Sequence, residues 1–167
     1  MPMSLTLIEA IAGRERAEAV ARDLGLAQWD GRHDSGALTL SRAFALTVMG
    51  NVLAFWNHEE LGIHLSPGVD EVSLALLADA WSRTYRSRAV TFAASAGAVE
   101  SRHGIRIVPD GASTTWPAER LLPPIGTRSP AIVVNDTLGA IRDRYGSRTL
   151  GIVTILLEYP AHDTPPS

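Results

Sequence analysis

Residues 62–81 read GIHLSPGVDEVSLALLADAW, and this stretch decides how the rest of the chain is interpreted. Its short apolar start, 62–65, runs into Pro67-Gly68, which is typical of a strand that ends in a tight turn. Asp70 stands at the N-cap position of a helix, and Glu71 follows near the positive end of the helix dipole. Apolar residues then recur every three or four positions, which predicts one buried helical face.

The chain continues with a second strand and a small hairpin. The segment AVTFAA at 89–94 is mostly apolar, as expected for a strand buried on both faces. Residues 105–107 alternate apolar, charged and apolar, which is typical of a half-buried strand. A strand, a helix and a strand in this order predict a right-handed parallel crossover. We therefore expect strands 63–65 and 90–93 to be parallel neighbours, with a helix over 70–85 packed on them.

These features, in this order, resemble the opening of the PfpI/ThiJ-like family, in the class I glutamine amidotransferase-like superfamily. The matching residues are the turn PGVDE at 67–71 and the stretch RHGIRIVPD at 102–110. The resemblance to the family's opening covers residues 62–110, and the stretches GRERA at 13–17 and LEYP at 157–160 also resemble the terminal helix of such domains. It implies an α/β fold with a small, mainly parallel sheet and flanking helices, which is a reduced flavodoxin-like architecture with N-terminal helices added.

The catalytic equipment of that family is missing from this sequence. Family enzymes carry a Cys on a strained strand-to-helix elbow, and a carboxylate just after the opening turn hydrogen-bonds to it. This chain has no Cys, and Ser73 occupies the carboxylate position counted from Gly68. The segment between Asp110 and Asn135 also lacks a Gly-x-Ser-x-Gly elbow. We therefore assign no catalytic residue and expect none of the family's activities.

The resemblance implies a non-catalytic module that binds or senses a small ligand, or that pairs with another subunit. Asp70, Glu71 and His103 would border a ligand crevice, because ligands of open α/β sheets bind at the carboxyl ends of the strands. A hydrolase or lyase that uses His33, His58 or Glu71 without a thiol is an alternative. A structural remnant of a larger tandem-domain protein is a third. Similar modules serve as sensor domains of transcription regulators, but no helix-turn-helix is evident here.

Composition excludes several classes of protein and of site. The net charge of −3 gives no electrostatic case for nucleic acid, although all 15 basic residues are Arg. The absence of Cys excludes disulfides and thiolate metal sites. His58 and His64 are too far apart for a zincin helix, so we expect no metal and no cofactor. The longest apolar run, 43–56, is too short to span a bilayer and no secretory signal is visible, so we expect a cytoplasmic protein.

Helices are expected before the deciding stretch. The segment 4–24 is helical, either continuous or divided at Gly13, and Gly25-Leu26 fits a left-handed cap. A second helix is expected over 41–61, and its apolar residues on more than one side predict burial on more than one side. Trp56 on this helix and Trp81 on the next are expected in the core. We divide the chain into an N-terminal helical segment, 1–61, and a reduced PfpI-like unit, 62–167, within one compact domain.

The C-terminal part repeats the N-terminal pattern. Asn135 or Asp136 is expected to cap a helix to Tyr145 after a Pro-rich connection. For residues 149–158 β-branched residues favour a strand, but an internal match favours a helix. At an offset of 133 the pattern helix, glycine, helix recurs, with Leu5, Ile8, Gly13, Val20 and Leu24 matching Leu138, Ile141, Gly146, Val153 and Leu157. Either the match is accidental, or the chain starts with the tail of one PfpI-like unit, with Met1 as a native start or a truncation.

A homodimer is the expected assembly. The first helical segment carries an apolar stripe that includes Leu5, Ile11 and Val20, and the second is apolar around much of its circumference. A large exposed apolar patch is unusual on a soluble monomer, and a twofold dimer buries one patch against its copy. We expect the first two helices in an interface of at least roughly 1,200 Å². The competing outcome is a monomer in which these helices fold back on their own sheet.

Overall fold

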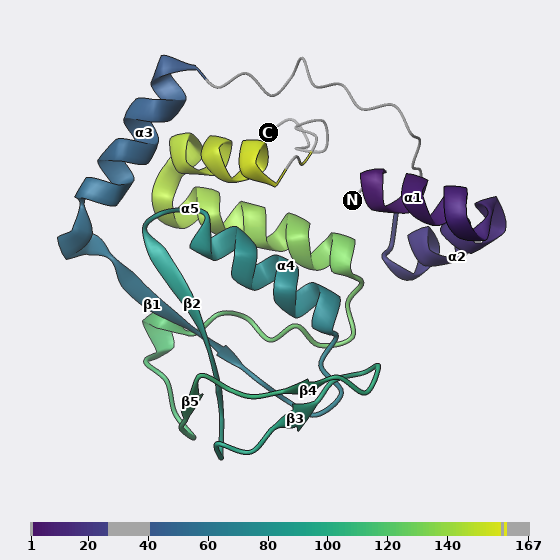
Figure 1. Cartoon of the computed structure of the whole chain (residues 1–167). Helices are drawn as coiled ribbons and strands as arrows, with labels where there is room; N and C mark the ends of the chain where they lie inside the picture. Colours follow the sequence, from purple (N-terminus) through teal and green to yellow (C-terminus); the bar gives the residue numbers. More distant parts are fainter. Residues whose placement is uncertain (1, 27–40, 158, 160–167) are drawn as a thin grey trace.

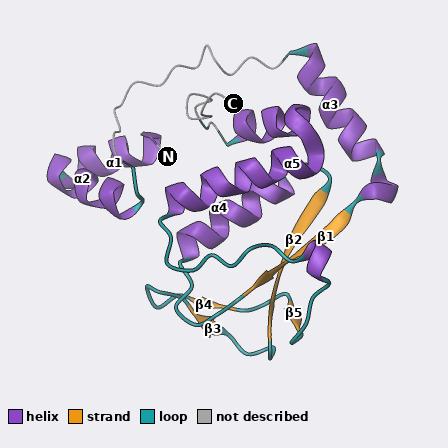
Figure 2. Ribbon diagram, turned by 180° about the vertical axis from the view of Figure 1, so that it is seen from behind, coloured by secondary structure: helices purple, strands orange, loops and turns teal. Residues whose placement is uncertain are grey.

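The computed structural model describes residues 2–26, 41–157 and 159. It is a mixed α/β fold in which a small parallel sheet carries two helices, α4 and α5, on one face (Figures 1 and 2). The sheet has the order β1-β2-β5, and a separate antiparallel pair, β3-β4, lies beside it. The described strands are β1 Glu59–His64, β2 Ser87–Ala93, β3 Val99–Glu100, β4 Arg106–Ile107 and β5 Gly111–Ala112. The described α-helices are α1 Pro2–Ala12, α2 Arg14–Asp23, α3 Arg42–Leu53, α4 Glu71–Ser82 and α5 Pro130–Leu156. This confirms the predicted fold class.

The predicted crossover is also confirmed. Strands β1 and β2 are parallel neighbours, with Ile63 opposite Thr91, and α4 connects them. Asp70 caps α4, since its Oδ1 accepts a hydrogen bond of 2.7 Å from the Ser73 amide. The buried face of α4 is the apolar one read from the sequence, and Leu77 and Trp81 lie in the core between α4, α5 and the sheet.

The other face of the sheet is covered by a loop side chain instead of a helix. The Trp116 ring stacks on Phe92 with ring centroids 5.0 Å apart. It also lies against Gly62, where an added Cβ would approach the ring to 2.5 Å. Gly62 is therefore required by close packing in the middle of β1, and it does not follow the end of a helix as the predicted helix over 41–61 requires.

The predicted second helix ends earlier than Leu61. Helix α3 stops at Leu53, a 3-10 turn follows at Phe55–Asn57, and β1 begins at Glu59. Leu61 is completely buried and pairs with Ala89 of β2, so strand pairing and burial outweigh the helical periodicity of this segment. The division that we placed between residues 61 and 62 falls inside β1.

The expected burial of this second helix on more than one side is wrong. One stripe of apolar side chains on α3 and the following turn faces solvent: Leu46, Met49, Leu53 and Trp56 are 53–71% exposed. Trp56 is therefore not a core residue, whereas Trp81 is. The opposite side of α3 is fastened by Asn51, which is buried and donates to the Thr84 carbonyl at 2.8 Å and to the Thr149 hydroxyl at 3.2 Å.

Helices α1 and α2 form a pair at one side of the molecule, away from the sheet (Figures 1 and 2). Gly13 divides them, as one of the two sequence interpretations had it. Gly25 takes φ 79° and Leu26 donates to the Ala21 carbonyl at 2.9 Å, which confirms the left-handed cap. The Leu24 carbonyl accepts a hydrogen bond of 3.1 Å from Ala131, in the first turn of α5.

Helix α5 starts earlier and runs further than the predicted helix. It begins at Pro130 after Ser129, so the predicted cap at Asn135 or Asp136 is wrong; Pro fits the first helical position because no intrahelical partner is needed there. Gly146 interrupts it with φ 83° and ψ 167° and the helix resumes to Leu156, which confirms the helical prediction for 149–156. Residue 158 lies outside the described residues.

Candidate functional site

The three residues predicted to border a ligand crevice lie at the carboxyl end of β1, between α4 and the β3-β4 hairpin. Nδ1 of His103 is 2.6 Å from Oε1 of Glu71. Asp70 forms a longer ion pair, with 3.9 Å between its Oδ2 and an Arg102 nitrogen. The structure therefore brings Glu71 and His103 into contact and places Asp70 on the neighbouring arginine.

Two backbone hydrogen bonds join the same two parts. The Gly68 amide donates to the Glu100 carbonyl and the Arg102 amide donates to the Val69 carbonyl, at 2.8 and 2.9 Å. Together with the side-chain contacts they fasten the β3-β4 hairpin to the turn before α4. The contacts of Asp70, Glu71 and His103 therefore help to hold the hairpin against the start of α4.

The electrostatics at Glu71 favour its charged form. The pKa of the Glu71 carboxyl is lowered first by its own backbone N–H at the start of α4 and then by His103, while burial acts in the opposite direction. A carboxylate can only accept, so His103 donates from Nδ1. Oε2 of Glu71 and the Ser73 hydroxyl are buried without a partner of normal hydrogen-bond geometry, although Ser101 lies close enough to Glu71 to lower that pKa as well.

The residues of the alternative enzyme lie apart in the sequence and differ in what the structure shows of them. His33 lies outside the described residues. His58 is hydrogen-bonded through Nε2 to the Asn51 carbonyl at 2.9 Å. Ser73, at the position of the family's carboxylate, is completely buried, so its hydroxyl is closed to a substrate.

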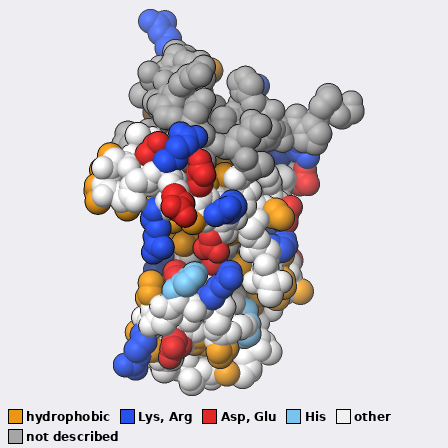
Figure 3. Space-filling view, turned by 90° about the vertical axis from the view of Figure 1, so that its right-hand side faces the viewer, with side chains coloured by type: hydrophobic (Ala, Val, Ile, Leu, Met, Phe, Trp, Pro, Cys, Tyr) orange, Lys and Arg blue, Asp and Glu red, His pale blue; other side chains and the backbone are white. Residues whose placement is uncertain are grey.

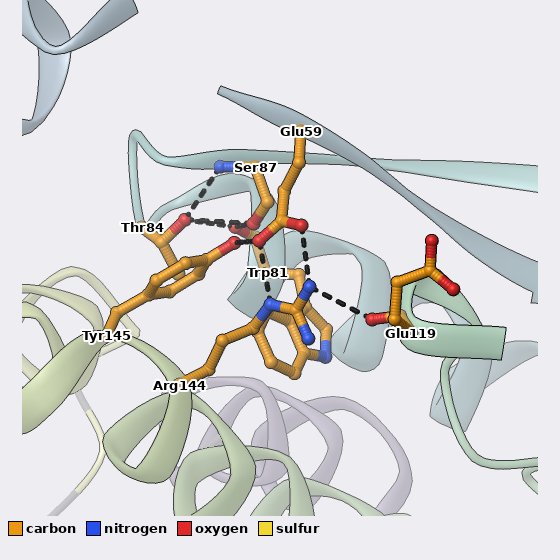
Figure 4. A network of polar contacts seen from close by, with 7 residues as sticks. All are labelled: Glu59, Trp81, Thr84, Ser87, Glu119, Arg144 and Tyr145. Carbon is orange, nitrogen blue, oxygen red and sulfur yellow. Dashed lines mark hydrogen bonds and ion pairs between the residues drawn. The ribbon is translucent and has the colours of Figure 1, made fainter. Parts of the chain in front are cut away.

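A polar network at the opposite, amino end of β1 was not predicted (Figure 4). Arg144 donates two hydrogen bonds, of 2.7 and 2.6 Å, to the Glu59 carboxylate. Tyr145 donates to the same carboxylate at 2.5 Å, and Arg144 also donates to the Glu119 carbonyl at 3.0 Å. The network ties α5, just before its break at Gly146, to the first residue of β1.

The pKa of each titratable group in this network is shifted in the direction that its surroundings favour. The Arg144 hydrogen bonds lower the pKa of Glu59 despite partial burial, and Glu59 raises the pKa of Arg144. Burial, followed by the bond to Glu59, raises the pKa of Tyr145 to about 12. No local sequence pattern predicts this network, because Glu59 and Arg144 are far apart in the chain and come into contact only in the folded structure.

The face that carries α1, α2 and the β3-β4 end differs from the exposed stripe of α3. Figure 3 shows acidic and basic side chains intermixed on this face, with a histidine among them.

No described helix combines the length and the apolar character needed to cross a bilayer. Within the described ranges no group of three or more His, Cys, Asp or Glu side chains is placed to hold a metal ion.

No protein-family model, no curated protein and no solved structure matches the chain.

Proposed function

We propose that this chain is a non-catalytic, PfpI-like module that pairs with a second copy of itself in the cytoplasm. The observation that carries the proposal is the stripe on α3: Leu46, Met49, Leu53 and Trp56 point to solvent while Asn51 holds the helix in place. A helix fastened on one side and apolar on the other is the arrangement expected of an interface.

A copy of the same chain fits this stripe better than a charged partner does. After Arg42, α3 contains no charged residue, so two such helices can approach without repulsion or unpaired charge. On α1, at another side of the molecule from α3 (Figure 1), Leu7 and Ile11 are also exposed, at 60% and 78%, and they form a separate apolar surface that a twofold pair could bury. The interface should reach at least roughly 1,200 Å² in total, as for other stable pairs.

The pairing is tested by light scattering at micromolar concentration on the full chain. The wild type should have twice the chain mass, and Met49→Glu should have the mass of one chain, because two buried carboxylates would face each other. Ile132→Glu is the matched control: Ile132 on α5 is 49% exposed, close to the 53% of Met49, and its substitution should leave the dimer intact. A wild type with the mass of one chain would contradict the proposal. A Met49→Glu variant that still has the dimer mass would show that α3 is not in the interface.

Small-ligand binding at Asp70, Glu71 and His103 is the second candidate, favoured by Oε2 of Glu71, which lacks a hydrogen-bond partner. Buried polar atoms normally have a partner, and a bound molecule with hydrogen-bond donors could supply it. A thermal-shift screen of small polar molecules on the wild type and His103→Ala tests this. A hit should stabilise only the wild type, whereas equal stabilisation of both proteins would place the hit elsewhere.

A further inference from the structure

The structure contains a cavity of about 480 Å³ at the amino ends of β1 and β2. Its walls come from the end of α3, the start of β1 and the turn between α4 and β2, and include Val52, His58, Glu60, Tyr85 and Arg88. This volume is within the range of about 300–1,000 Å³ typical of small-molecule sites. The cavity lies at the other end of β1 from the predicted crevice, and its wall residue Val52 belongs to α3, the helix that carries the proposed pairing stripe.

Tyr85 is held in the cavity wall by a strained backbone. Among the residues that the structure describes it is the one non-glycine residue with positive φ, at 56°. The turn is fixed by the buried Thr84 hydroxyl, which donates to the Trp81 carbonyl and accepts from the amides of Arg86 and Ser87, at 2.7, 3.1 and 3.2 Å. Glycine is the ordinary residue for this conformation, and a bulky residue kept there is associated with binding sites.

The polar groups of the wall provide both charges. Arg88 and Glu60 face each other across neighbouring strands in register, with 3.7 Å between their charged atoms. Both side chains are more than half exposed, so this ion pair is loose and open to exchange with a ligand. Glu59, also in the wall, is already engaged by Arg144 and Tyr145.

His58 adds an acceptor. Its Nε2 lies 2.9 Å from the Asn51 carbonyl, which can only accept, so Nε2 carries a proton. In the neutral ring Nδ1 is then an acceptor. Val52 and the Tyr85 ring supply apolar surface beside these polar groups.

We propose that this cavity binds a small zwitterion, an α-amino acid with an aromatic or large apolar side chain. Arg88 takes the carboxylate, because a guanidinium matches its two oxygens, and Glu60 takes the ammonium. The Tyr85 ring and Val52 pack against the side chain. An α-amino acid carries its two charges on one carbon, which suits two opposite charges projecting from adjacent strands.

The ligand class is tested by titration calorimetry of the full chain with three probes. L-phenylalanine should bind, and phenethylamine and 3-phenylpropanoate, which lack the carboxylate and the ammonium respectively, should each bind at least about tenfold more weakly. Arg88→Gln should abolish the advantage of L-phenylalanine over phenethylamine, and Glu60→Gln its advantage over 3-phenylpropanoate. Arg106→Gln, on β4, is the control and should change neither. Absence of binding for all three probes at millimolar concentration, or an equal loss for all three in Arg88→Gln, would overturn the proposal.

Tyr85→Gly separates a binding role from a structural one. Glycine relieves the positive φ, so the variant should be at least as stable in urea unfolding, while the affinity for L-phenylalanine should fall about tenfold or more. Tyr85→Asn, which also tolerates this conformation, serves as the second variant. Unchanged affinity in a folded variant would contradict the proposal. Light scattering of the same variants should still give the dimer mass, so a failure of the ligand assignment and a failure of pairing are distinguishable.

Discussion

The two helix-glycine-helix segments of this protein share a backbone geometry but not an environment. Gly13, between α1 and α2, has φ 85° and ψ 162°, and Gly146, within α5, has φ 83° and ψ 167°. In α5 the flanking Ile141 and Val153 are completely buried. Their counterparts at the offset of 133, Ile8 and Val20, are only partly buried.

This difference shows which part of the structure is set locally. The break at each glycine requires a backbone conformation that is essentially restricted to glycine, so the same local sequence gives the same turn twice. Burial depends on what lies beneath: α5 covers α4 and the sheet, whereas α1 and α2 bury mainly Leu5, Ala17 and Ala21. The shared turn agrees with the proposed duplication of a PfpI-like tail, which remains a proposal.

The largest expected effect compares the two matched isoleucines. Ile141→Ala should reduce the free energy of unfolding by about 2–5 kcal/mol, because it leaves a cavity in the core. Ile8→Ala should cost about 1 kcal/mol or less, as expected for a partly exposed position. Urea unfolding followed by circular dichroism measures both. A cost for Ile8→Ala that approaches that of Ile141→Ala, and that grows with protein concentration, would show that the second copy covers α1 and α2 as well as α3.

A smaller effect should come from the hydrogen bonds that Arg144 and Tyr145 of α5 make to Glu59. Arg144 and Tyr145 hold Glu59, whereas the matched positions in the N-terminal segment are Ile11 and Ala12. The folded pKa of Glu59 is lowered from its usual value of 4.5, so the unfolded chain takes up the proton first as the pH falls. The stabilisation is therefore complete above the unfolded pKa and is lost as the pH falls through the folded pKa.

The measurement is the free energy of unfolding of wild type and Glu59→Gln between pH 7 and pH 3. The two should differ by a constant amount near neutral pH and converge in acid. Glu9→Gln is the control, because Glu9 lies on α1 in an exposed ion pair of 3.4 Å with Arg14 and should follow the wild type throughout. If the free energies of unfolding of wild type and Glu59→Gln still differ at pH 3, the charge of the Glu59 carboxylate is not the source of the stabilisation.

The parts of the fold that sequence predicted correctly have local causes. Pro67-Gly68 and Asp70 define a turn and a cap within a few residues, so the strand, helix and parallel strand around them could be placed. The start of β1 could not, because no turn signal separates residues 59–61 from the helical apolar pattern before them, and pairing with β2 makes them a strand. The sequence analysis placed Glu71 and His103 at one ligand crevice but did not predict their contact. The Glu59 network depends on contacts between residues far apart in the chain, which no local pattern indicates, and the strained backbone of Tyr85 was not predicted.

The hydrogen bond from Ala131 to the Leu24 carbonyl gives the outlying helix pair a role in the stability of α5. The first turn of any helix has amides without intrahelical partners, and Ser129, at the N-cap, makes no side-chain hydrogen bond to them. Leu24, at the end of α2, fills that need for one amide. The peripheral segment thus suppresses fraying at the start of its buried counterpart, and a chain shortened by these first two helices would release one end of the longest helix it has left.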